Sequence, residues 1–277
     1  MAASPFAIVT FILLLGLPAS SFAEWRFSAS TTDHDHNISN RETQLHVEVQ
    51  PKASESEYWG ARHNYRVFDL PDVNRTPAAS NGHVHALSGF WRHRFDRWQV
   101  ELAPTLAVSS NVLRNPDTLS ASDWHLHGSA IRRFDLRDQG EFYGGLRIDN
   151  RLGDYLPYPM VQWQRQLPAD IRLALGVPDS AVDWYWHPRL RWRLSLGPDG
   201  GSWRVRDSQI DSAGRLEQRR WHTSLALAWH AQSPLTIQLG ASYYFQERWR
   251  YQLSDGSTTR LEQPNHTALW VGLSIQP

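Results

Sequence analysis

Arginine residues recur at two-residue spacing in the second half of the sequence, where Arg189, Arg191 and Arg193 alternate with mostly apolar residues. Side chains two residues apart lie on one face of a β-strand. A row of guanidinium groups inside a narrow, water-filled pore favours anions and sets which solutes pass. The arginines that we predict to line such a lumen are Arg147, Arg172, Arg189, Arg191, Arg193, Arg204 and Arg206.

The same arginines could instead act as structural braces of the barrel wall. Glu101, Asp149 and Asp183 belong to the same polar stretches, and ion pairs with them would stiffen a barrel wall. The sequence leaves both roles open.

Three histidine pairs have one residue between their members: His34 and His36, His83 and His85, and His125 and His127. On a strand this spacing aims both imidazoles to one side, and imidazole binds zinc, copper or nickel. We expect all three pairs near the end of the barrel that carries long loops. The strands bearing His83 and His125 would be separated by one strand, roughly 10 Å across the sheet. We therefore predict no metal site and no cofactor.

A hydrolase is the third candidate chemistry. His36-Asn37-Ile38-Ser39-Asn40 resembles the His, Ser and Asn of outer-membrane lipid hydrolases. Their pattern has one residue between His and Ser, which places both side chains on one strand face. Here two residues intervene, which sends them to opposite faces. The sequence therefore assigns no catalytic residue and leaves enzymatic activity open, without favouring it.

Composition excludes several classes of protein. The 277 residues contain no Cys, and 28 basic residues balance 28 acidic ones. The absence of cysteine rules out a disulfide scaffold and a cysteine-ligated metal centre. A net charge of zero argues against a nucleic-acid partner. After the first segment no apolar run approaches the ~20 residues that a membrane-spanning helix needs.

The first segment is typical of a secretory signal peptide. An apolar run from Phe6 to Leu17 is followed by Pro18, and Ser21-Phe22-Ala23 supplies the small residues of a cleavage site. We expect a signal peptide at 1–23 and a single barrel domain at 24–277. The alternative is a short membrane anchor that is not cleaved.

The rest of the chain must position these side chains, and it alternates apolar and polar residues with the period of strands rather than helices. Turn residues divide it into about fourteen strands, although twelve would also fit. The expected strands are 24–32, 41–50, 56–68, 82–94, 97–110, 122–134, 140–151, 156–166, 170–178, 182–197, 201–211, 218–231, 234–253 and 258–276. Short and long connections take turns between them. We predict an all-β, antiparallel, up-and-down transmembrane β-barrel.

A soluble β-sandwich would alternate in the same way, with its apolar face inside. Two features favour a membrane barrel: a polar face rich in Arg, His, Gln and Asp, and tryptophans near strand ends. We expect Trp59, Trp98, Trp163 and Trp229 near the short turns. We expect Trp124, Trp184, Trp186 and Trp221 near the long loops.

Together the signal, the alternating strands of ~10 residues and the terminal strand 266–276 resemble Gram-negative outer-membrane β-barrel proteins. The segment from Phe142 to Trp192 is most similar to an uncharacterised family of such barrels, through Tyr155-Leu156-Pro157-Tyr158-Pro159, Leu175-Gly176-Val177-Pro178 and Trp184-Tyr185-Trp186. Such proteins usually end in an aromatic residue, whereas this chain ends Ile275-Gln276-Pro277.

The resemblance implies a location in the cell outer membrane and contact with its lipid and with the barrel-assembly machinery. The function that we expect is a pore or transport channel for small polar or anionic solutes. The alternatives are a plugged binding or structural barrel and a lipid-acting outer-membrane hydrolase.

Overall fold

The computed structural model describes residues 21–30, 43–51, 56–68, 82–114, 117, 119–207, 212–232, 235–253 and 256–275. The expected signal peptide lies outside these ranges except for Ser21-Phe22-Ala23, which begin β1. His34, His36 and Ser39 also lie outside them. Within the described ranges, no helix combines the length and hydropathy of a candidate membrane span.

Strands make up almost all of the described structure. They are β1 (Ser21–Ser30), β2 (Thr43–Pro51), β3 (Glu57–Phe68), β4 (Gly82–Phe95), β5 (Trp98–Ser109), β6 (Trp124–Asp135), β7 (Glu141–Asp149), β8 (Leu156–Leu167), β9 (Ile171–Val177), β10 (Ser180–His187), β11 (Leu190–Pro198), β12 (Gly201–Asp207), β13 (Ser212–Gln232), β14 (Leu235–Leu253), β15 (Thr258–Glu262) and β16 (His266–Ile275). The helical elements are α2 (Ser110–Arg114), η3 (Ala121–Asp123) and η4 (Arg137–Gln139).

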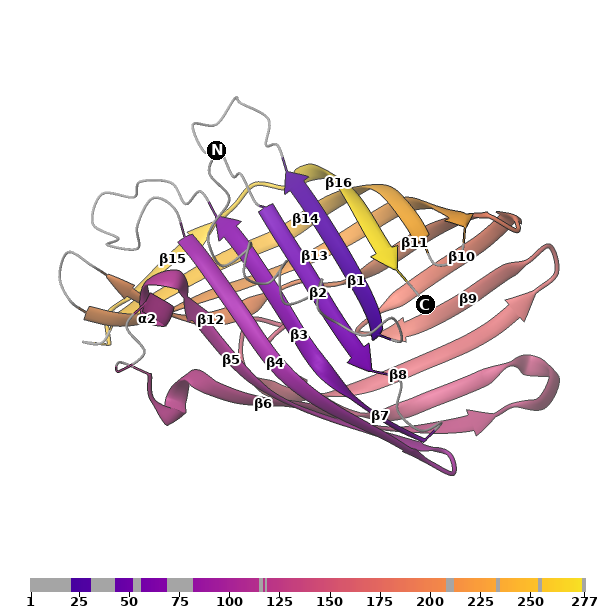
Figure 1. The fold of residues 1–277 in the computed structure, drawn as a ribbon, viewed down its shortest axis with the longest axis horizontal. Helices are drawn as coiled ribbons and strands as arrows, with labels where there is room; N and C mark the ends of the chain where they lie inside the picture. The colour runs from indigo at the N-terminus through magenta and orange to yellow at the C-terminus, as the bar shows by residue number, and fades with distance from the viewer. Residues whose placement is uncertain are drawn as a thin grey trace.

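These strands form one 16-stranded sheet that closes on itself (Figure 1). Each strand from β1 to β11 pairs with the next, β11 pairs with β13, β13 with β14, β14 with β16, and β16 with β1. The tight hairpins β6–β7, β8–β9 and β10–β11 point to the right of Figure 1, and α2 and β15 lie at the left. We call these the short-turn end and the long-loop end. The chain is therefore a closed all-β barrel.

At the long-loop end the barrel wall is closed through β12 and not through β6 to β11. β11 and β12 lie one after the other along β13, with Pro198 opposite Trp221 where β11 stops. β12 then makes a parallel bridge to β5, between Arg204 and Val108. The pairing of β6 with β5 has already ended, at Leu106. The sheet therefore passes from β5 to β12 at this level and leaves out β6 to β11.

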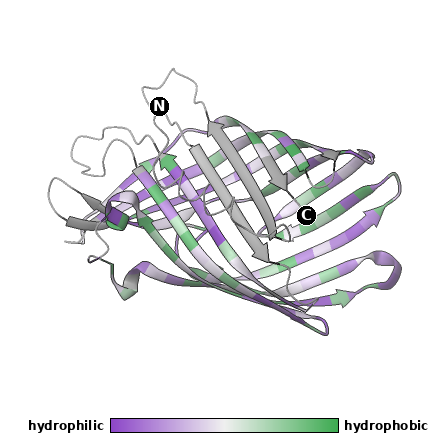
Figure 2. Ribbon diagram, in the orientation of Figure 1, coloured by the Kyte–Doolittle hydropathy of each residue, from purple (hydrophilic) through white to green (hydrophobic). Residues whose placement is uncertain are grey.

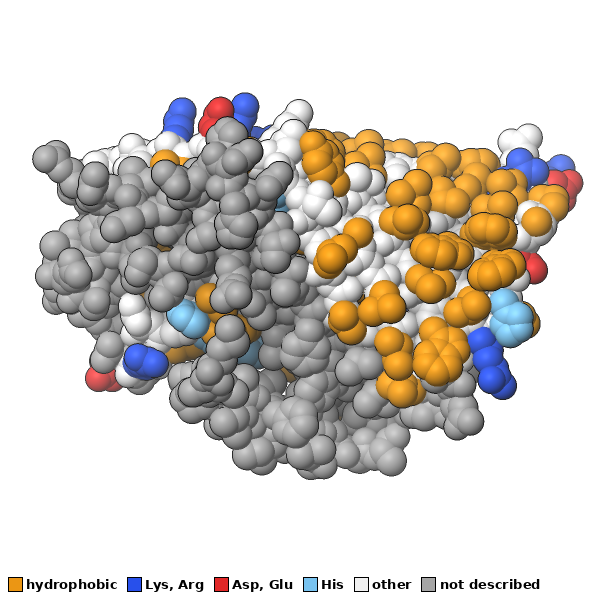
Figure 3. All heavy atoms as spheres, turned by 90° about the horizontal axis from the view of Figure 1, so that it is seen from above, with side chains coloured by type: hydrophobic (Ala, Val, Ile, Leu, Met, Phe, Trp, Pro, Cys, Tyr) orange, Lys and Arg blue, Asp and Glu red, His pale blue; other side chains and the backbone are white. Residues whose placement is uncertain are grey.

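Side chains of opposite character face the two sides of the wall. Figure 2 shows hydrophobic and hydrophilic residues alternating along the strands. Large apolar side chains such as Leu269, Trp186 and Leu146 are 68%, 64% and 61% exposed. Hydrophobic side chains gather over the strands at the top right of Figure 1 when the barrel is viewed from above (Figure 3). Apolar groups on the outside and polar groups on the inside reverse the arrangement of a soluble barrel.

Two of the expected strands are each divided in the structure. The predicted strand 182–197 is the β10–β11 hairpin, which turns at Pro188 and Arg189. Trp184 pairs with Trp192 across it, so even-numbered residues face one side on both strands. The alternation continues in phase through the turn and conceals it. The predicted strand 258–276 is likewise β15 and β16, and β13 begins at Ser212 rather than at 218.

This hairpin also corrects the placement of two tryptophans. We expected Trp184 and Trp186 near the long loops, but both lie in β10 close to its turn into β11, at the short-turn end. The turn also moves Arg189 from the middle of a strand to the tip of a hairpin.

Candidate functional site

A cavity of about 770 Å³ lies inside the barrel on the side of β8 to β11, β13, β14 and β16. Most of its lining is polar, because the residues that alternate with the outward-facing apolar ones point into the lumen. One wall carries Gln162, Gln164, Arg172, Asp183, Arg191 and Arg193. The facing wall carries His222, Ser224, His230, Thr236, Gln238, Ser242 and Trp270.

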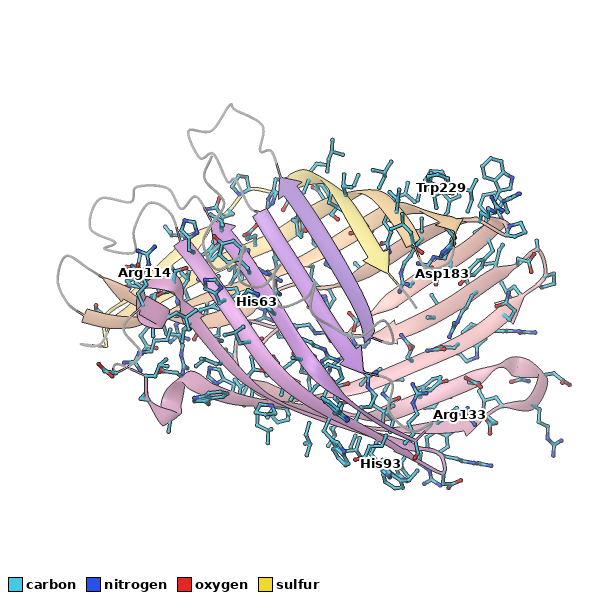
Figure 4. The ribbon with its side chains drawn as sticks, in the orientation of Figure 1. His63, His93, Arg114, Arg133, Asp183 and Trp229 are labelled. Carbon is cyan, nitrogen blue, oxygen red and sulfur yellow. The ribbon has the colours of Figure 1, made fainter. Side chains whose placement is uncertain are left out.

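Two of the predicted lumen arginines lie near one carboxylate in this cavity, and a third occupies the neighbouring position on the next strand. Asp183 lies opposite Arg193 on β11 and opposite Arg172 on β9. Asp183 Oδ1 is 3.7 Å from both Arg191 Nε and Arg193 Nη1. Arg172 donates a 2.9 Å hydrogen bond to Gln164. The cavity lining also includes Asp179 and Asp199. Asp179 pairs with Arg151, and Asp199 pairs with Arg66 and Arg220, so Asp183 is the carboxylate that remains beside the three arginines. Asp183 is labelled in the short-turn half of Figure 4.

The other predicted arginines are placed differently. Arg147 Nε is 3.2 Å from Asp149, as expected of a brace. Arg204 Nη1 is 2.6 Å from Asp123, which is 2% exposed. Arg189 is exposed at the β10–β11 turn, and Arg206 lies in β12 with its side chain outside the described ones. The ladder that the sequence suggested therefore divides into a cavity group and a bracing group.

At the level where β12 begins, a buried ionic network lies in the lumen, and no local sequence pattern indicates it. Asp199, in the connection between β11 and β12, accepts hydrogen bonds from Arg66 Nη2 at 2.6 Å and from Arg220 Nε at 3.1 Å. Arg66 also donates to Gln218, and Gln218 donates to Glu247 Oε1 at 2.8 Å. We call these five residues the lumen network.

The lumen network is buried except for Asp199, whose side chain is 17% exposed and faces the cavity. Arg220, Gln218 and Glu247 are 1%, 0% and 2% exposed. The guanidinium of Arg220 lies 3.9 Å from the centre of the Tyr244 ring. Burial raises the pKa of Asp199, but Arg220 and Arg66 outweigh that effect and hold the pKa below its ordinary value. The carboxylate therefore stays charged and keeps both guanidinium groups in place.

An apolar cluster lies beside the lumen network and fills the long-loop end around β12. Its buried members are Val84, Ala107, Trp203, Val205, Leu216, Trp249 and Tyr251. Trp249 joins the two groups, because its indole N–H donates a 2.8 Å hydrogen bond to Glu247. The lumen is therefore hollow beside the arginines and packed with side chains at the long-loop end.

The two described histidine pairs lie near the first residues of β4 and β6, at the long-loop end as expected, but on opposite faces of the wall. His85 faces outwards with Leu87, whereas His125 and His127 face inwards with Thr105. In the described part of the chain, no group of three or more His, Asp or Glu side chains is arranged to hold a metal ion.

Comparisons with known proteins give distant similarities. No family model matches the chain, and no curated protein matches it. The crystal structure of the siderophore receptor PirA from Acinetobacter baumannii is 8% identical, with a TM-score of 0.25; the match covers 94% of this chain and 60% of the receptor. Two mutants of the Rh. blastica porin are each 9% identical, with a TM-score of 0.26, over 92% of this chain and 99% of the porin.

Proposed function

We propose that this chain is an outer-membrane β-barrel that passes small polar or anionic solutes through its lumen. In this proposal the strands other than β12 and β15 cross the membrane. The observation that carries it is the reversal of faces. Large apolar side chains such as Leu239 and Leu225 are 54% and 49% exposed on the outside, and the cavity inside the barrel is lined mostly by polar residues. Lipid, rather than water, stabilises such an outer face.

The charge of the cavity lining supports small polar or anionic molecules as the class of solute. Arg172, Arg191 and Arg193 line the cavity together with Asp183. The other two carboxylates of the lining, Asp179 and Asp199, pair with arginines outside it. The facing hydroxyl and amide groups of Ser224, Gln238 and other residues can replace the hydration of a polar solute. A small anion or a neutral polar molecule fits this lining better than a cation does.

A planar-bilayer measurement tests the proposal. The refolded barrel is expected to conduct, and its reversal potential in a KCl gradient should show preference for chloride. Replacing Arg172, Arg191 and Arg193 together by glutamine should reduce that preference, because the charge is removed while hydrogen-bonding capacity is retained. Arg133→Gln is the matched control, because Arg133 forms an ion pair with Asp135 outside the cavity lining. The side chains of Arg133 and Asp135 are 47% and 46% exposed. A triple variant with the wild-type reversal potential would contradict the proposal.

The lumen network favours a second candidate function, a plugged barrel that binds a solute without passing it. A plugged barrel would give a different result in the bilayer measurement than a channel. The wild-type protein would then show no channel events in the bilayer, while the same three arginine replacements would still weaken solute binding.

A further inference from the structure

A serine and two histidines form a continuous hydrogen-bonded row on the outside of the barrel, away from the lumen. His85 Nε2 is 2.8 Å from Ser110 Oγ, and His85 Nδ1 is 3.0 Å from His63 Nε2. The two imidazole planes differ by only 8° and the ring centroids are 5.3 Å apart, which is the separation expected when parallel rings meet through their nitrogen atoms. A serine, a base and a group that orients the base are the parts of a nucleophilic hydrolase.

The fold explains why these residues meet. β5 ends at Ser109, and the chain turns outwards into α2, whose Val112 packs on Leu106 and Val108 of the outer face. Ser110, the first residue of α2, is thereby placed over β4, next to His85. Figure 4 shows His63 and Arg114, the last residue of α2, at the same end of the barrel.

Strand register places the row on the outer face. His85 on β4 pairs with Val108 on β5. Two residues further along β4, on the same face, is the exposed Leu87, and Leu87 pairs with His63 on β3. Trp59 and Trp91, which pair further down the same face, are 56% and 37% exposed. A strip of apolar surface therefore leads along the outside of the barrel to Ser110.

From this arrangement we infer that Ser110, His85 and His63 form a hydrolytic site for acyl esters of membrane lipid. This inference rests on the proposed membrane location of the barrel, because the acyl chain would lie along the apolar strip of Trp59, Trp91 and Leu87. It places lipid hydrolysis at residues other than His36 and Ser39, where the sequence suggested it.

The chemistry balances without a cofactor. Ser110 Oγ attacks the ester carbonyl carbon, and its proton passes to His85 Nε2, while His85 Nδ1–H donates to His63 Nε2. The tetrahedral intermediate expels the alcohol, which takes the proton from His85 and leaves an acyl ester on Ser110. Water then attacks that ester, gives a proton to His85 and releases the fatty acid, and the proton returns to Ser110.

The roles of the two histidines differ. His85 is 2% exposed and in contact with the nucleophile, so it is the catalytic base. His63 is a positioning residue that acts through His85. An aspartate in its place could accept the same hydrogen bond, whereas an alanine could not.

The test uses the full barrel in mixed micelles with a phospholipid that carries a labelled acyl chain. Wild-type protein should release fatty acid, and Ser110→Ala should lower the rate by about 100-fold or more. Ser109→Ala is the matched control, because Ser109 is the preceding residue, is 7% exposed and shares the inward face of Ala107. It should keep the wild-type rate. Heat-modifiable mobility on gels checks that every variant is folded.

Two further measurements separate chemistry from structure. A fluorophosphonate probe should attach to Ser110 in the wild-type protein, as located by mass spectrometry. His63→Ala should lower kcat more than it raises KM, and His63→Asp should restore part of kcat. Release of fatty acid at the same rate by Ser110→Ala, or the lack of both turnover and probe adduct, would overturn the inference. Cleavage of short soluble esters alone would overturn the lipid part of it.

This test is independent of the channel proposal. Ser110→Ala should leave the bilayer conductance unchanged, because Ser110 lies on the outer face. If the wild-type protein did not conduct in the bilayer, this result would count against the channel proposal and not against the hydrolytic site.

Discussion

The two ends of the lumen are built from the same alternating strands but hold different contents. Beside β9, β10 and β11, short side chains and spaced arginines leave a cavity of about 770 Å³. At the long-loop end, β12 bridges to β5, and the lumen network and the apolar cluster fill the interior. The difference shows that alternation decides which side of a wall a residue faces, whereas the size of the inward-facing side chains, together with the extra strand β12, decides whether the interior is hollow.

Removing the central carboxylate should have the largest effect on this contrast. Asp199→Asn keeps the shape but removes the carboxylate that pairs with Arg66 and Arg220, and only Glu247, 3.9 Å from Arg220, still provides negative charge there. The change should lower the free energy of unfolding by about 4 kcal/mol. The packed end should loosen, so conductance should rise. Denaturant unfolding in micelles and bilayer recording check both effects. Asp135→Asn, in an exposed pair, is the control. An unchanged conductance would show that the network does not limit passage.

A smaller loss of stability is expected from the apolar part of the packed end. Leu216 is 3% exposed within the cluster around β12, so Leu216→Ala should cost about 3 kcal/mol through lost burial and a residual cavity. Leu239→Ala on the exposed outer wall provides the comparison in micelles. Equal losses for the two variants would argue that the cluster around Leu216 is not packed.

Enlarging the hollow end should change conductance little. Trp270 points into the cavity, and its indole donates a 3.1 Å hydrogen bond to Ser242. If the packed end sets the resistance, Trp270→Ala should alter single-channel conductance much less than Asp199→Asn does. A larger increase for Trp270→Ala would place the narrow point in the cavity instead.

The smallest effect is expected outside the lumen. Arg248 and Glu262 form a 3.3 Å ion pair whose side chains are 67% and 77% exposed. Glu262→Gln should therefore change the free energy of unfolding by less than about 1 kcal/mol. Conductance should also stay at the wild-type value, and a clear change in it would connect this surface to the passage.

Alternation predicted the strands well where each one ends at a loop. The expected 82–94 and 234–253 compare with Gly82–Phe95 for β4 and Leu235–Leu253 for β14. It could not show the turn at Pro188, because the apolar phase continues across the hairpin. The bridge between Arg204 and Val108 was equally hidden, since a single parallel contact between distant segments leaves no local pattern.

The site was predictable to a similar extent. Two-residue spacing indicated that Arg191 and Arg193 share a face, but not that both would lie near Asp183. The lumen network joins Arg66, Asp199 and Glu247 from distant parts of the chain, so only tertiary structure reveals it. Ser110 and His85 were likewise separated by a strand in the sequence and are neighbours only because α2 turns back over β5.

The unequal lengths of the strands have a consequence for the surrounding bilayer. β9 and β10 have 7 and 8 residues, whereas β13 and β14 have 21 and 19. A transmembrane strand needs about 9–11 residues. In a membrane the barrel would thus present a low rim on one flank and a high rim on the other. Hydrophobic mismatch of this kind is relieved by tilt or by thinning of the adjacent lipid, so acyl chains beside β9 and β10 should be the most disordered around the protein.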